Sequence, residues 1–133
     1  MGFALSEIQL QSTAFKNGEM IPDKHTGTGE DVSPELLWSK PPEGTKAYAL
    51  ICHDPDAPLI SENGTYGFVH WTLYNIPADV TSLAEGSGEF TQGVNNMGNS
   101  GYNGPMPPEG HGDHHYYFWI LALDKETALE PGL

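Results

Sequence analysis

Aspartate and histidine residues in three stretches of the sequence have the types and spacing to bind or activate a small ligand. Asp54 and Asp56 lie in the segment ICHDPDAP, His70 lies in GFVHWTLYNI, and the segment GHGDHH adds three more histidines. A carboxylate that accepts a hydrogen bond from one imidazole nitrogen leaves the other nitrogen as a donor and favours the charged ring. Histidines paired in this way could bind an anion, ligate a metal ion or transfer a proton.

The segment GHGDHH is the most suggestive of a metal site. Its histidines are His111, His114 and His115, and neutral imidazoles near carboxylates form many zinc sites. Because His114 and His115 are adjacent, a strand would point them to opposite sides, and both could ligate one ion only at a bulge. We therefore expect no metal and no cofactor. A hydrolase that uses Asp54, His70, His111 and His114 as metal ligands or as acid and base stays open as an alternative.

Prolines stiffen the stretch that carries the two aspartates. Pro55 and Pro58 push the residues before them, Asp54 and Ala57, into extended conformations. We expect a pre-organised turn, which can present two carboxylates at fixed positions at a low cost in ordering entropy. The alternative is that Asp54 or Asp56 only bonds the main chain two residues further on.

Three apolar stretches predict the strands that must position these side chains. They are KAYALIC (46–52), GFVHWTLYNI (67–76) and HHYYFWILALD (114–124). A half-buried strand is also expected in SEIQLQSTAF and a short one at Leu36–Trp38, and PADVTSLAEG could hold one helical turn. Because 16 glycines and 11 prolines interrupt the rest, we expect a mainly β protein with a single domain over residues 1–133.

Alternation along these strands predicts which side chains lie together. In the second strand, one face should carry a mostly aromatic set: Phe68, His70, Thr72 and Tyr74. In the third strand, His114 and Tyr116 should share a face. His70 could also be an ordinary core histidine held by a hydrogen bond.

The charge of the chain limits its partners. Eighteen acidic residues face five basic ones, all lysine, for a formal net charge of -13. Such a surface repels nucleic acid and anionic membranes, so we expect neither nucleic-acid binding nor stable membrane insertion. The N-terminus lacks the features of a signal peptide, and the lone Cys52, which has no disulfide partner, is expected to be buried and inert. A cytoplasmic location follows from these features.

Four motifs, in order along the chain, resemble the phosphatidylethanolamine-binding protein family, in particular its bacterial branch, which is similar to the Raf kinase inhibitor proteins. They are GEDVSPELLW, DPDAP, HWTLYNIP and GYNGPMPPEGHGDHHYYF, and they span Gly29 to about Asp124. The resemblance implies a β-sandwich around a large antiparallel sheet, with short helical turns and a small anion-binding pocket. Family members usually continue into a C-terminal helix and strand. Because the chain ends at Leu133, we expect that part to be absent.

The resemblance also implies the residues of the pocket. The turn would supply Asp54 and Asp56, the second strand His70 and, at the rim, Phe68; the loop and the last strand would supply Gly104, Met106, Pro107, His114 and Tyr116. Family ligands are phosphoryl or carboxylate groups, such as phosphoethanolamine or acetate. His115 stands where the family has an arginine, so the role of that arginine is altered or made dependent on pH.

The sequence therefore favours a protein that binds a small phosphorylated or carboxylated ligand, that is not an enzyme, and that could regulate other proteins through this pocket. The alternatives are an inhibitor of a kinase or protease that acts by protein contact, and the hydrolase described above. A protein partner such as a kinase fits the resemblance. We expect a monomer or a homodimer.

Overall fold

A computed structural model describes residues 6–61, 64–105 and 114–133 of the chain. Within this part, short strands form a small antiparallel sheet in the order β1 (Gln9–Gln11), β2 (Leu36–Ser39) and β5 (Ser82–Leu83). A larger antiparallel sheet has the order β6 (Thr91–Gln92), β4 (Gly64–Pro77), β3 (Ala47–Ser61) and β7 (Tyr117–Leu123). One 3-10 helix, η1, covers Asp23–His25. The prediction of a mainly β protein is confirmed.

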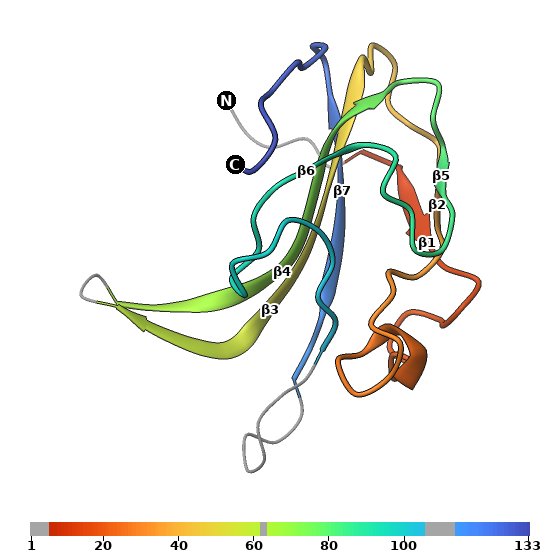
Figure 1. Cartoon of the computed structure of the whole chain (residues 1–133). Helices are drawn as coiled ribbons and strands as arrows, with labels where there is room; N and C mark the ends of the chain where they lie inside the picture. Colours follow the sequence, from red (N-terminus) through yellow and green to blue (C-terminus); the bar gives the residue numbers. More distant parts are fainter. Residues whose placement is uncertain (1–5, 62–63, 106–113) are drawn as a thin grey trace.

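Strands β3 and β4 form a long hairpin that extends beyond the rest of the molecule (Figure 1). Its register shifts where Asp54 pairs with Phe68 but Leu59 already pairs with Tyr66, so four residues of β3 lie opposite one residue of β4. The predicted turn at DPDAP is therefore wrong, because this segment continues strand β3 as a bulge. Proline suits an extended backbone, and a bulge tolerates its missing N–H group.

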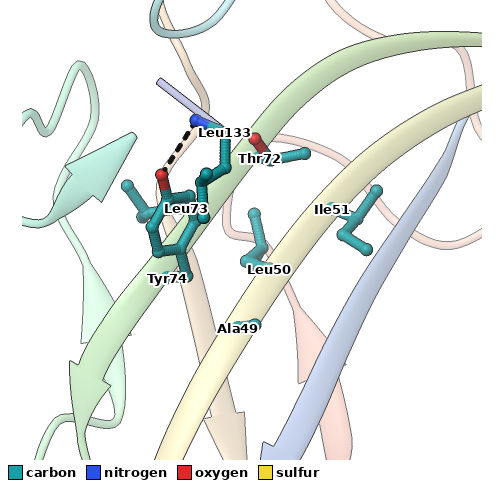
Figure 2. Close-up of a pocket in the computed structure, with 7 residues that line it drawn as sticks. All are labelled: Ala49, Leu50, Ile51, Thr72, Leu73, Tyr74 and Leu133. Carbon is teal, nitrogen blue, oxygen red and sulfur yellow. Dashed lines mark hydrogen bonds between the residues drawn. The ribbon is translucent and has the colours of Figure 1, made fainter. Parts of the chain in front are cut away.

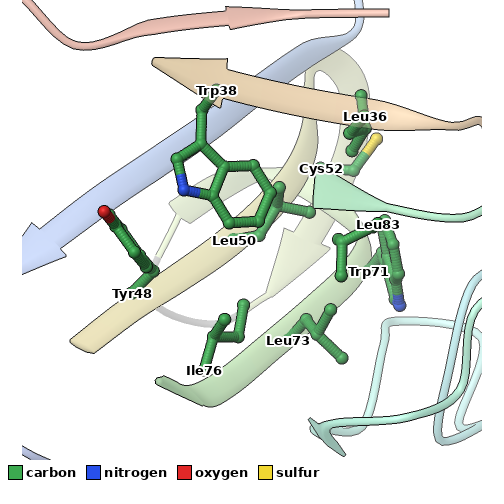
Figure 3. Close-up of a cluster of buried hydrophobic side chains, with 9 residues drawn as sticks. All are labelled: Leu36, Trp38, Tyr48, Leu50, Cys52, Trp71, Leu73, Ile76 and Leu83. Atoms are coloured by element: carbon green, nitrogen blue, oxygen red, sulfur yellow. The ribbon is translucent and has the colours of Figure 1, made fainter. Parts of the chain in front are cut away.

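The core lies between the two sheets. Leu36, Trp38 and Leu83 from the small sheet meet Leu50 and other side chains of the large sheet (Figure 3). The rest of this cluster comes from β3 and β4: Tyr48, Cys52, Trp71, Leu73 and Ile76. Burial raises the pKa of the Cys52 thiol, which therefore stays protonated, as expected of an inert cysteine.

The weaker strand predictions are confirmed by β1 and β2, but the predicted helical turn in PADVTSLAEG is wrong. That segment instead contains β5, in which Ser82 and Leu83 pair with Leu37 and Leu36. Pairing with β2 places Leu83, which is 1% exposed, in the core, and this packing outweighs a weak local preference for helix. In residues 6–61, 64–105 and 114–133, no helix is long and apolar enough to cross a bilayer.

Candidate functional site

A buried aspartate–histidine pair joins β3 to the residues that precede β7. The Nδ1 atom of His114 lies 2.6 Å from Oδ2 of Asp54, and both side chains are 2% exposed. The other carboxylate oxygen of Asp54 accepts a hydrogen bond from the main-chain N–H of Asp56 at 2.8 Å. Asp54 therefore has both of the roles considered from the sequence. It bonds the main chain two residues further on, and it orients the imidazole of His114.

A second pair lies beside the first and faces solvent. Oδ2 of Asp56 accepts hydrogen bonds from the main-chain N–H of His115 at 2.7 Å and from its ring Nδ1 at 2.8 Å. The side chain of His115 is 71% exposed, whereas that of its neighbour His114 is buried, so the two histidines point to opposite sides as predicted. Asp56 therefore fixes the start of the last strand, and its carboxylate is directed to His115.

His70 is held by the main chain and not by an aspartate. Its Nδ1 lies 2.7 Å from the carbonyl oxygen of Asn103, and the N–H of Asn103 bonds the carbonyl oxygen of His70. Burial lowers the pKa of His70, and the bond to Asn103 and the charge of Asp54 only partly oppose this effect. Among the described residues, His70 therefore lacks the hydrogen-bonded carboxylate that would favour its charged form.

Aromatic side chains surround this histidine. The ring centroids of His70 and Phe68 are 4.7 Å apart, and those of His70 and Tyr116 are 5.4 Å apart. Tyr116 also lies near His114, at 6.4 Å between ring centroids. Burial raises the pKa of Tyr116 to about 12, so its phenol keeps its proton and can donate a hydrogen bond near neutral pH.

The predicted face of β4 is divided by a bulge. Phe68 and His70 contact each other, but Thr72 and Tyr74 lie with Ala49 and Ile51 around a separate shallow pocket of about 230 Å³ (Figure 2). The cause is a register shift between Cys52 and His53, where one extra residue of β4 breaks the alternation. This pocket is apolar, and the hydroxyl of Tyr74 is already bonded to Glu130 and Leu133, so it lacks the features of an anion site.

Sequence reasoning missed Asp31, which organises the loop behind His70. Its carboxylate accepts hydrogen bonds from the N–H of Gly104 at 2.6 Å and from the side-chain amide of Asn103 at 3.3 Å. Gly104 is buried, and a Cβ there would collide with the carbonyl oxygen of His25 and lie 2.9 Å from Oδ1 of Asp31. Gly104 thus serves close packing of the loop. The signal for Asp31 was its place in the motif GEDVSPELLW.

Asn95 and Asn99 brace the same loop from the other side. The side-chain amides of both donate to Oδ1 of Asn103, at 2.7 Å and 3.0 Å, and Asn95 also bonds the carbonyl oxygen of Gly101. The carbonyl group that holds His70 is therefore fixed by Asp31 on one side and by an asparagine cluster on the other. The orientation of the His70 ring is therefore supported by the whole loop.

Three of the sequence-predicted residues, Met106, Pro107 and His111, lie outside the described residues. Among those that the structure does describe, no group of three or more histidine, cysteine, aspartate or glutamate side chains is arranged to hold a metal ion. The structure brings together Asp54, His70, His114, Tyr116 and Phe68, with Asp56 beside them and Gly104 in the supporting loop.

Comparison with known proteins identifies relatives of this chain. A family model described as phosphatidylethanolamine-binding protein matches residues 11–133. A UPF0098 protein of Aquifex aeolicus is 45% identical, over 94% of this chain and 74% of the relative.

Two solved structures have the same fold. That of Escherichia coli YbcL, described as a new member of the mammalian PEBP family, has a TM-score of 0.87 and 37% identity, over 96% of this chain and 83% of that one. That of a Chlamydia trachomatis PEBP homologue has a TM-score of 0.84 and 39% identity, over 97% and 83% of the two chains. The chain therefore belongs to the phosphatidylethanolamine-binding protein family, together with bacterial members such as YbcL.

Proposed function

We propose that the protein binds small molecules through a phosphoryl or carboxylate group, next to the first residues of β7. The observation that carries this proposal is the contact between His70 and Tyr116 beside the buried Asp54–His114 pair. It supports anion binding because a phenol donates a hydrogen bond, and the imidazole beside it can accept one when neutral or donate one when protonated. Hydrogen bonds of this kind are stronger in a buried, low-dielectric site than in water.

The composition of the chain is consistent with this choice of donors. The sequence has no arginine, so the planar guanidinium that often binds phosphate or carboxylate is not available. Within the aromatic wall of this site, His70 and Tyr116 supply the polar atoms. The wall itself, formed by Phe68 and Tyr116 around His70, would exclude water from the bound group.

The test is a titration of labelled protein with acetate, inorganic phosphate and phosphoethanolamine, followed by NMR at about pH 6, within the histidine titration range. We expect saturable shifts at the rings of His70 and Tyr116. His25 is the internal reference, because it is also buried and its Nδ1 also contacts a main-chain carbonyl, that of Val32, at 2.8 Å. A titration in which none of the three anions moves the His70 ring would contradict the proposal.

A matched pair of variants locates the site. Tyr116→Phe removes one hydroxyl donor and should weaken binding about two- to tenfold, the effect of losing one hydrogen bond of roughly 0.5–1.5 kcal/mol. Tyr117→Phe removes the same group from the next residue, which is 47% exposed and stacks on Trp119, and should leave affinity unchanged. Equal effects of the two changes would place the anion elsewhere.

A second candidate is the inhibition of a kinase or protease by protein contact. The observation that favours it is the row of exposed side chains on β7, where Tyr117, Trp119 and Leu121 are 47%, 52% and 41% exposed. Aromatic residues are enriched in protein interfaces. Capture of a purified kinase that is lost in Trp119→Ser but kept in Tyr116→Phe would support this function, and capture unaffected by Trp119→Ser would oppose it.

A further inference from the structure

We propose that the site selects a phosphate monoester in its singly charged, proton-bearing form, over a dianion and over a phosphodiester such as a lipid headgroup. The inference rests on the proposed function, because it specifies which anion that site accepts. It is carried by the hydrogen-bonding roles that the surrounding main chain imposes on His70 and by the neighbouring hydroxyl of Tyr116.

The first step concerns the tautomer of His70. Its Nδ1 lies 2.7 Å from the carbonyl oxygen of Asn103, and a carbonyl only accepts, so Nδ1 must carry the proton. In the neutral ring, Nε2 then has only a lone pair and can only accept a hydrogen bond. Among the described residues Nε2 has no hydrogen-bond partner, and it is not one of the fully enclosed polar atoms.

The second step concerns the pairing of donor and acceptor. Burial lowers the pKa of His70, so its ring is neutral at neutral pH, whereas Tyr116 retains its O–H group. The two rings contact each other, with centroids 5.4 Å apart, so neighbouring side chains of the site carry one acceptor and one donor. A group with both a P–OH and a P–O⁻ matches this pair: the P–OH donates to Nε2, and the P–O⁻ accepts from Tyr116.

The third step concerns charge. Among the described residues, the titratable groups that act on His70 or contact it are Asp54 and His53 from β3, Asp31 from the loop before β2, and Tyr116 before β7. The negative charges of Asp54 and Asp31 act to raise the pKa of His70, because they favour its protonated form. The same charges oppose a second negative charge on the ligand. The net charge of -13 adds to this opposition.

The acceptor on His70 and the donor on Tyr116 distinguish between ligands that carry the same charge. The second pKa of a phosphate monoester is about 6, so near that pH the monoester carries its own proton. A phosphodiester or a sulfate ester is also singly charged but has no proton to donate. An oxygen of such a ligand would meet the lone pair of Nε2. The bound ligand would then cover this acceptor and leave it without a donor, unless the ring takes up a proton at a further cost.

The experiment compares methyl phosphate, dimethyl phosphate and methyl sulfate by calorimetry at about pH 6, with the ring of His70 followed by NMR. We expect methyl phosphate to bind at least tenfold more tightly than the other two. Its affinity should fall at least tenfold between about pH 6 and pH 8 as the monoester loses its proton. Equal affinity for the three probes, or tighter binding of methyl phosphate at the higher pH, would overturn the selection.

The outcomes separate this inference from the proposed function. Equal binding of the three probes at His70 keeps the anion site and removes the selection, whereas shifts with none of them remove the site itself. His70→Gln provides a second check, because a glutamine amide can turn either a donor or an acceptor toward the ligand. In this variant the preference should shrink to within about threefold while the three probes still bind, since each keeps a partner of about equal hydrogen-bond strength. A preference kept in full by His70→Gln would contradict the assigned role of the ring.

Discussion

At the scale of single residues, Asp54 connects two segments through one buried carboxylate. Its Oδ1 accepts the N–H of Asp56, and its Oδ2 contacts Nδ1 of His114. The first bond fixes the bulge of β3, and the second fixes the residues before β7. A buried carboxylate with both oxygens engaged in this way is sensitive to any change in its charge or shape.

Replacing Asp54 with asparagine should destabilise the protein. The amide can still accept the N–H of Asp56, but it loses the charge that strengthens the bond to His114, at an expected cost of about 1.5–3 kcal/mol in the free energy of unfolding. Urea unfolding measures this cost. The control is Asp79→Asn at an exposed position, where a change below about 0.5 kcal/mol is expected. A cost at Asp54 no larger than that of the control would show that the buried pair is not stabilising.

The Asp56–His115 pair predicts a dependence on acid pH. Hydrogen bonds from His115 lower the pKa of Asp56. The bond from the main-chain N–H has the largest effect and the bond from the ring the next largest, and desolvation of the carboxylate opposes them only in part. Because the pKa of Asp56 is lower in the folded state than in the unfolded state, the pair stabilises the fold at pH values above the ordinary pKa of aspartate. This contribution is lost as the pH falls through the folded-state pKa.

Carboxyl NMR of Asp56 in His115→Ala tests this assignment. The titration midpoint should rise toward the usual value but not reach it, because the main-chain N–H at position 115 still donates to the carboxylate. An unchanged midpoint would mean that the imidazole of His115 contributes nothing to the shift.

Asp31 acts on His70 both through its charge and through the loop. Asp31→Asn keeps an acceptor for the N–H of Gly104 but removes a charge that favours the protonated ring, so the pKa of His70 should fall further. Asp31→Ala should in addition loosen the loop and broaden the His70 ring signals. The control is Glu30→Gln, at the adjacent residue, whose side chain is 68% exposed. If Asp31→Asn left the pKa of His70 where it is, the charge effect would be disproved.

At the scale of elements, the sequence predicted the strands β3, β4 and β7, but the alternation of side chains could be predicted only in β7, which has no bulge. Along β7 the alternation is unbroken, so the exposed Tyr117 and Trp119 and the inward-facing Phe118 follow from the sequence. In β4 the shift at His70 cannot be deduced from the residues of β4 alone, because a bulge depends on the partner strand.

The contacts of the loop were also beyond prediction from sequence. The bond between His70 and Asn103 joins residues 33 positions apart, and Asp31 meets Gly104 across 73 positions. Local propensity says nothing about such pairs, whereas the Asp54–His114 pair could be anticipated because a family motif lies at each end. The residue types and motifs therefore indicated where the site lies, whereas its hydrogen bonds could be identified only from the folded structure.

Gly104 tests the packing of this loop. Gly104→Ala places a methyl group against the carbonyl oxygen of His25, so the loop must move, at an expected cost of about 1–3 kcal/mol in stability. The movement should also shift the His70 ring signals. Gly88→Ala is the matched control, since its added Cβ would meet only Gln92 at an ordinary 3.6 Å. Two variants with the same stability would refute the close packing at Gly104.

At the scale of the whole molecule, the two sheets divide the aromatic residues into a core and an exposed face. Trp38 and Trp71 are 2% and 0% exposed between the sheets, whereas Trp119 is 52% exposed on the far side of the large sheet. The predicted two-sheet architecture is confirmed by this burial pattern and by the fold of the solved relatives.

Tryptophan fluorescence tests this division. Acrylamide, an uncharged quencher, should reach one of the three tryptophans, and Trp119→Phe should remove the accessible fraction of the emission. The same change should alter stability far less than Trp71→Ala, for which a loss of about 3–5 kcal/mol is expected. Quenching that persists unchanged in Trp119→Phe would mean that the core tryptophans are exposed and that the sheets do not pack as described.

The measurement that tests the central claim most directly is a ¹⁵N NMR spectrum of the histidine rings at about pH 6, recorded while methyl phosphate is added. The free protein should have His70 as the Nδ1–H tautomer, and the ligand should shift its Nε2 signal saturably while the rings of His25 stay unmoved. A His70 ring that carries its proton on Nε2, or that does not respond to the ligand, would contradict both the geometry of the site and its proposed role.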